Sequence, residues 1–167
     1  MSDILKIGLL LRDGGPIVGR KKLQKIVHVL QESGVDFEAH YELSHFGPYS
    51  SELKGAIDEL IAANLIEEKP EGTGNVQYSV TGAFINLLRR TASEAPATWT
   101  VVAQELNGRD VGELEGISTI LFLESRGWHD SDLNGRFKSL KPHLSDRFEQ
   151  FLTSGLAFKK KRNSAPV

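Results

Sequence analysis

The amino-acid sequence predicts a mainly α protein of the α+β class: a winged helix-turn-helix with a β-hairpin wing and a C-terminal helical extension. Three observations predict this fold. Apolar residues recur at helical spacing in the first third, a turn-rich stretch at 70–75 separates two short strand-like segments, and only helical patterns follow residue 98. The chain therefore divides into a winged-helix-like domain (1–92), a C-terminal helical half (98–157) and a basic tail (158–167) that we expect to be disordered.

The composition is that of one globular domain, and it excludes several kinds of site. The chain has 167 residues, of which 40% are hydrophobic and 25% charged. It has no cysteine, so disulfides, thiolate nucleophiles and cysteine-based zinc sites are excluded. The N-terminal apolar run is short and is interrupted by Asp3 and Lys6, which argues against a signal peptide or membrane span. We expect a cytoplasmic protein with no membrane partner.

Two helices are predicted at the N-terminus, over 2–12 and 19–31, and Gly34 ends the second. Apolar residues of the second helix fall at i, i+3, i+4 and i+7 and form one buried stripe: Leu23, Ile26, Val27 and Leu30. The opposite face, which we expect to be exposed, carries Lys21, Lys25, His28 and Glu32. This pattern predicts an amphipathic helix with one wet side.

A loop, a third helix and a hairpin follow. Gly47-Pro48 excludes continuous regular structure in the loop, which we expect to hold a short strand around 37–43. The third helix is predicted over 51–64, with Ser50 or Ser51 as its cap. Strands at 65–67 and 76–80 flank the turn-rich tip, and Thr81 caps a fourth helix. In this plan the hairpin is the wing, and the third helix is the recognition helix.

Four further helices are predicted in the C-terminal half. The first ends at Asn107-Gly108, the second near Gly127 and the third at Leu140, and Pro142 opens the last. The last helix carries a stripe made of Leu144, Phe148, Phe151 and Leu152. Such a stripe either closes the core or mediates a homodimer, and the sequence leaves both open.

Two stretches combine charge with aromatic side chains: "GRKKLQKIVHVL" at 19–30 and "HFGPYS" at 45–50. We expect the helix and the loop to form a face that docks a protein partner. Its residues are Arg20, Lys21, Lys22, Lys25, His28, His45, Phe46 and Tyr49. The same charges also fit the solvated side of an ordinary helix, and the sequence does not separate these interpretations.

The alternative function is that of a DNA-binding transcriptional regulator. The cations available for it are Arg20, Lys22, Lys25, Lys54, Lys159, Lys160, Lys161 and Arg162. The predicted recognition helix and the hairpin, however, together hold Lys54 and Lys69 against six acidic residues, a net charge of −4. Because phosphate neutralisation supplies most of the affinity for DNA, this charge argues against the alternative.

No catalytic, metal or cofactor site is predicted. The five histidines lack the spacing that places two metal ligands on one helical face. The sequence "GTGN" at 72–75 lacks the helix and lysine that follow a phosphate-binding loop. We therefore expect a non-enzymatic protein without a cofactor.

The sequences "KLQK" (22–25) and "HFGPY" (45–49) resemble the YwgA-like bacterial proteins and, more distantly, the Panacea or SocA-like antitoxin domain. The resemblance covers roughly residues 1–90. It implies a winged-helix-like regulatory or neutralising module, often encoded beside toxin or defence genes. From this resemblance we expect the partner to be a toxin or a defence component.

Overall fold

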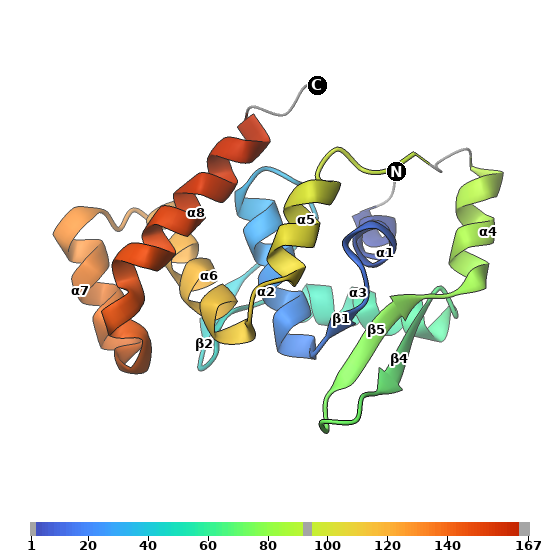
Figure 1. The fold of residues 1–167 in the computed structure, drawn as a ribbon, viewed down its shortest axis with the longest axis horizontal. Coiled ribbons are helices and arrows are strands. Elements are labelled where there is room, and N and C mark those ends of the chain that lie inside the picture. The colour runs from blue at the N-terminus through green and yellow to red at the C-terminus, as the bar shows by residue number, and fades with distance from the viewer. Residues whose placement is uncertain (1–2, 92–94, 164–167) are drawn as a thin grey trace.

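Helices surround two small antiparallel sheets in the computed structural model of the protein, which describes residues 3–91 and 95–163 (Figure 1). The helices are α1 (Asp3–Gly14), α2 (Arg20–Glu32), α3 (Ser51–Ala62), α4 (Gly82–Arg90), α5 (Thr100–Asn107), α6 (Val111–Ser125), α7 (Asp130–Leu140), the 3₁₀ helix η1 (Pro142–Arg147) and α8 (Phe148–Asn163). The strands are β1 (Ile17–Val18), β2 (Glu42–Ser44), β3 (Gly47–Tyr49), β4 (Ile66–Pro70) and β5 (Val76–Val80). The predicted α+β class is confirmed.

The predicted hairpin is present as β4 and β5, which pair antiparallel from Ile66 opposite Val80 to Pro70 opposite Val76. Strand β1 pairs with the other side of β5, so the strand order of this sheet is β1-β5-β4. The caps of the flanking helices also follow the prediction. The side chain of Ser50 accepts a hydrogen bond from Leu53 N at the start of α3, and that of Thr81 accepts one from Phe84 N at the start of α4.

Helix α2 lies at the centre of the molecule and is covered on more than one side. Every residue from Leu23 to Leu30 is buried. Helix α6 of the C-terminal half packs directly against α2 and is itself buried from Leu114 to Leu123. One continuous cluster of buried apolar residues runs through both halves of the chain, with α8 on the far side of α6 (Figure 1). The two halves therefore share one core.

The expectation of a disordered tail from residue 158 is wrong as far as Asn163, because α8 continues to that residue. Phe158 is buried in the core, and the Lys159 ammonium pairs with Glu124 of α6 at 2.7 Å. The burial of Phe158 and the ion pair of Lys159 stabilise the helix beyond residue 157. The basic composition of this segment did not indicate these contacts. Residues 164–167 of the predicted tail lie outside the described residues.

Within the part of the chain that the structure describes, no helix is long and apolar enough to cross a membrane.

At two places a helix packs so closely against an aromatic ring that only glycine fits at the contact. A Cβ atom on Gly116 of α6 would lie 2.3 Å from the ring of Phe151 in α8. A Cβ atom on Gly8 of α1 would lie equally close, 2.3 Å, to the ring of Phe84 in α4. The glycine inside the first helix, which lowers helix propensity, is therefore explained by close packing.

Replacing Gly116 by alanine should destabilise the protein, although alanine is the better helix former. We expect the free energy of unfolding of Gly116→Ala to fall by about 2 kcal/mol, because the new methyl group overpacks the core. The matched control is Gly55→Ala in α3, where nothing lies within 4 Å of the added Cβ. This control should gain about 0.5–1 kcal/mol. Urea unfolding of both variants measures the difference, and equal effects would contradict this packing.

Candidate docking site

Two residues of the predicted docking face are not on the surface. Lys25 and His28 are each only 1% exposed, so the expectation that they touch a partner is wrong. The physical reason is the position of α2. Its apolar stripe predicts that the opposite face is exposed to solvent, but α6 and the β2–β3 hairpin cover that face. Both side chains act inside the molecule instead.

Gln24 and Lys25 hold the strand end that follows the predicted loop. The Gln24 side chain donates to Ser50 O at 2.8 Å and accepts from Ser50 N at 3.0 Å. The Lys25 ammonium donates to Pro48 O at 2.6 Å. Three hydrogen bonds from neighbouring residues of α2 therefore fix the backbone of 48–50, and all three are buried.

The other end of the loop is held from the C-terminal half. Lys141, between α7 and η1, donates from its ammonium to His45 O at 2.8 Å and to a carboxylate oxygen of Glu115 at 2.7 Å. Lys141 is 3% exposed and Glu115 is 8% exposed. A buried ion pair of this kind is stable only when further hydrogen bonds satisfy its members, and the His45 carbonyl supplies one of them.

Gly47 lets the loop lie directly against α6. Its φ of +90° is in the left-handed region that favours glycine. A Cβ atom there would lie 3.0 Å from Thr119 Oγ1 and 3.5 Å from the side chain of Glu115. Any larger residue would push the loop away from α6. The glycine of the "HFGPY" sequence is therefore required by both the turn and the close approach.

Phe46 is the exposed tip of this fixed loop. Its side chain is 51% exposed, an unusual exposure for a large aromatic residue. The Lys21 ammonium lies over the ring, 3.7 Å from its centre, and the His45 ring packs against its edge with centroids 4.8 Å apart. The structure thus places Lys21, His45 and Phe46, three predicted docking residues, next to one another.

Two grooves adjoin Phe46 and Lys21. The first has a volume of about 200 Å³ and mainly apolar walls, to which Arg20, Gln24, Lys25, Ser44 and Tyr49 also contribute. The second has a volume of about 650 Å³ and is completed by His45, Glu115 and the segment 139–143. Phe46 and Lys21 line both grooves, and we call this shared pair the ridge. Arg20 and Tyr49, both predicted docking residues, line the first groove.

The interior position of Lys25 changes its protonation behaviour. Burial lowers the pKa of Lys25 from its ordinary 10.5 to about 8, while the nearby carboxylate of Glu115 opposes this shift. Lys141 and Lys21 lower the pKa of Lys25 further. The ammonium form therefore predominates at neutral pH and keeps its bond to the Pro48 carbonyl.

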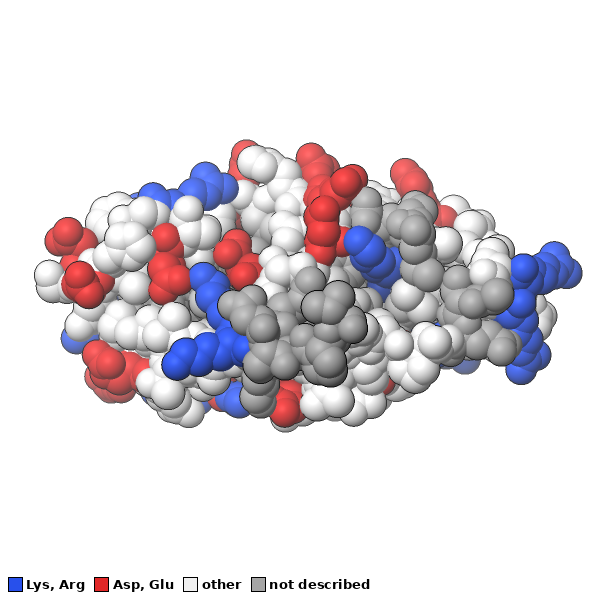
Figure 2. All heavy atoms as spheres, turned by 90° about the horizontal axis from the view of Figure 1, so that it is seen from above, with Lys and Arg blue, Asp and Glu red and all other residues white. Residues whose placement is uncertain are grey.

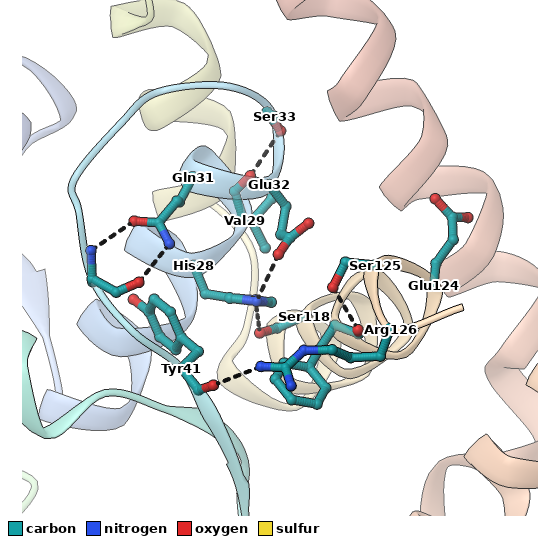
Figure 3. A network of polar contacts seen from close by, with 12 residues as sticks. His28, Val29, Gln31, Glu32, Ser33, Tyr41, Ser118, Glu124, Ser125 and Arg126 are labelled. Atoms are coloured by element: carbon teal, nitrogen blue, oxygen red, sulfur yellow. Dashed lines mark hydrogen bonds and ion pairs between the residues drawn. The ribbon is translucent and has the colours of Figure 1, made fainter. Parts of the chain in front are cut away.

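His28 belongs to a separate polar network between α2 and α6 (Figure 3). Its Nδ1 lies 2.7 Å from Ser118 Oγ, and its Nε2 lies 3.5 Å from the Glu32 carboxylate. Its ring also packs on Tyr41, with centroids 4.6 Å apart. Burial lowers the pKa of His28, so the ring is neutral at neutral pH. This histidine joins two helices and has no surface for a substrate, because Ser118 is fully buried.

Most described cations of the predicted DNA-binding set are buried or already have partners inside the protein. Arg20 donates to Tyr78 Oη and pairs with Glu68, Lys22 donates to Asn107 O, and Lys54 pairs with Asp58. Lys25 is buried and Lys159 pairs with Glu124. Lys160 is an exposed residue of α8. The side chains of Lys161 and Arg162 lie outside those that the structure describes.

Sequence reasoning missed Gln24, Glu115 and Lys141 as site residues. Glu115 carried a signal, since an acid inside the apolar run "LEGISTILFL" predicts a buried and paired carboxylate. Lys141 carried none, because a lysine before Pro142 is ordinary at a helix boundary. Gln24 was noticed as part of "KLQK", but its bonds to Ser50 depend on the tertiary fold.

Among the described residues, no three His, Asp or Glu side chains are grouped in a way that could hold a metal ion.

Comparison with known proteins gives one informative similarity. No family model matches the sequence. The chain is similar to the uncharacterized protein YwgA of Bacillus subtilis (strain 168), with 28% identity over 158 residues. The match covers 91% of this chain and 93% of YwgA. It supports the predicted resemblance to YwgA-like proteins and extends it from residues 1–90 into the C-terminal half. It does not support the more distant antitoxin resemblance.

The burial of Lys25 predicts a pH-dependent stability. Between pH 8 and 10 the unfolded chain keeps the Lys25 proton that the folded protein loses, so the free energy of unfolding rises with pH. We expect wild type to gain about 2 kcal/mol relative to Lys25→Met over this window, measured by urea unfolding. The control Lys69→Met on the β4–β5 hairpin should keep the wild-type slope, because Lys69 is exposed, pairs with Glu67 and is not among the groups that shift the pKa of Lys25. A difference between wild type and Lys25→Met that stays constant with pH would contradict the assignment.

Proposed function

We propose that the protein is a non-enzymatic regulatory module that binds a protein partner through Phe46 and the two grooves beside it. The observation that carries this proposal is the exposure of Phe46 on a fixed loop. A ring that is 51% exposed stands on backbone held by two buried ammonium groups and a buried amide. An aromatic anchor next to pockets is the usual centre of a protein–protein interface.

The way the loop is held favours binding over a purely structural role. Burying lysine side chains opposes folding unless the lysines are well paired, and two of them are used here on loop carbonyls. The loop could satisfy these carbonyls with water at no such cost if its conformation were unimportant. A loop that is rigid before binding loses little conformational entropy when a partner docks. The arrangement therefore supports a preorganised docking site.

We also propose that the N-terminal half is a winged helix. The element order α1, β1, α2, α3, β4, β5, with the β2–β3 hairpin inserted between α2 and α3, supports this proposal, as does the pairing of β1 with β5 in the same sheet as β4. In this arrangement α3 is the recognition helix and the hairpin is the wing. The docking site lies elsewhere, at the β2–β3 hairpin that separates α2 from α3.

DNA reading by α3 and the wing has less support, because their lysines already have acidic partners. Lys54 pairs with Asp58 at 2.8 Å and Lys69 pairs with Glu67 at 2.9 Å. The carboxylates left over would repel phosphates. Figure 2 shows the molecule from above the view of Figure 1, and over much of that one face basic and acidic side chains are mixed. The charges of α3 and the wing therefore do not support the DNA-binding alternative.

The toxin or defence setting and the cytoplasmic location stay predictions. The first came from the family resemblance, and the YwgA similarity assigns no activity to either protein.

A photo-reactive residue at position 46 tests the docking proposal. With p-benzoylphenylalanine at 46 in cells of the source bacterium, we expect one partner protein to be cross-linked. The same residue at 101 should not capture that partner, although Val101 is 65% exposed on α5. With the purified partner, Phe46→Ala should weaken binding about 30-fold, the loss typical of a central aromatic anchor, and Val101→Ala by less than about twofold.

Two outcomes would contradict the proposal. One is the absence of any protein cross-linked at position 46 beyond those cross-linked at 101. The other is a purified partner that binds wild type and Phe46→Ala with equal dissociation constants, in which case the ridge is not the docking site.

A further inference from the structure

We infer that the partner segment seated at this site carries an acidic side chain close to an apolar one, with the acid in the larger groove and the apolar group in the smaller. This inference rests on the proposed docking function and gives the partner its chemistry. It follows from the different walls of the two grooves and from the ridge that they share.

The smaller groove fits one apolar side chain. Its volume of about 200 Å³ is below the roughly 300–1,000 Å³ of ordinary small-molecule sites. The rings of Phe46 and Tyr49 contribute to its walls, together with the stems of Lys21 and Lys25. Long charged side chains commonly present their carbon stems to an apolar neighbour and keep the charge at the edge. An aliphatic or aromatic side chain is therefore the occupant that these walls favour.

The larger groove favours a carboxylate. Lys21, His45, Lys141 and His143 surround its volume of about 650 Å³. Glu115 is the one acidic residue among the groove-lining residues that the structure describes, and Lys141 already neutralises it at 2.7 Å. No carboxylate pairs with Lys21 among the described residues, so its ammonium remains available to an incoming acid.

The charge of the two grooves differs from that of the whole protein. Four cationic residues line them against one acid: Arg20, Lys21, Lys25, Lys141 and the acid Glu115. Arg20 and Lys141 already pair with Glu68 and Glu115, so the excess positive charge comes from Lys21 at the surface and from the buried Lys25. The complete chain has a formal net charge of −2. A positive site on a negative protein attracts acidic segments and rejects basic ones, since complementary charge governs both approach and specificity. The electrostatic contrast therefore selects an acidic occupant.

The shared ridge sets the spacing within that segment. Because Phe46 and Lys21 line both grooves, we expect a chain that fills both to pass over this pair. Side chains of an extended chain point alternately to opposite sides. We therefore expect the acidic and the apolar residue within about three positions of each other. The Phe46 ring would contact the backbone between them.

A display library of random 12-residue peptides tests this inference directly, with the full-length protein as bait. Selected peptides should carry Asp or Glu within three positions of Leu, Ile, Met or Phe. Synthetic copies should bind about tenfold more weakly to Lys21→Glu and about threefold more weakly to His143→Glu, measured by fluorescence polarisation. These variants change groove residues on different elements, α2 and η1, so one remains informative if the other perturbs the loop. Lys69→Glu on the wing is the matched charge control and should bind as wild type does.

The outcomes separate this inference from the docking proposal. Selected peptides without an acid, peptides that bind the two groove variants as tightly as wild type, or a library without any binder would overturn the inference. If position 46 still cross-links a partner in cells, the docking proposal stands and only the partner chemistry is wrong. If the peptides behave as expected but position 46 cross-links nothing, the acidic-segment site is real and the cellular docking proposal fails.

Discussion

The contact between the Lys141 ammonium, the Glu115 carboxylate and the His45 carbonyl is the constraint on which the docking site depends. It joins the α7–η1 boundary, the N-terminal part of α6 and the turn of the β2–β3 hairpin inside the protein. Removing one member of a buried ion pair leaves an uncompensated charge, which typically costs about 3–5 kcal/mol. Together with Lys25 on Pro48 O, the contact fixes both sides of the turn that presents Phe46. Buried contacts on both sides of the turn therefore position the exposed ring of Phe46.

This constraint gives the C-terminal helices a function. Without α6, the loop would lose Thr119 and Glu115, against which Gly47 packs. Without the α7–η1 boundary, the larger groove would lose Lys141 and His143. The N-terminal half supplies the loop, and the C-terminal half supplies its support and one wall of the site. The similarity to YwgA over 91% of the chain accords with a fold in which both halves are needed.

Local patterns predicted the parts of this structure that local physics determines. The caps Ser50 and Thr81 and the hairpin around 70–75 are recognisable because a turn or a cap needs particular residue types. Lys25 and His28 were misplaced because periodicity identifies one apolar face but cannot tell when a second element buries the polar one. Lys141 was invisible, since its partners lie 26 and 96 positions away. Phe46 was found because an aromatic residue beside a Gly-Pro turn is a local signal, and Lys21 because it lies in the basic run at 20–25.

The most direct test of this account is backbone hydrogen exchange across the loop in Lys141→Met. We predict a larger rise in exchange at the backbone amides between residues 44 and 50 than in α2 and α6, because the variant releases the hairpin locally in addition to lowering the overall stability. The β2–β3 pairing, which joins Glu42 to Tyr49, should open more often than in wild type. Unchanged exchange at 44–50 in a folded Lys141→Met variant would contradict the claim that this lysine holds the docking loop in place.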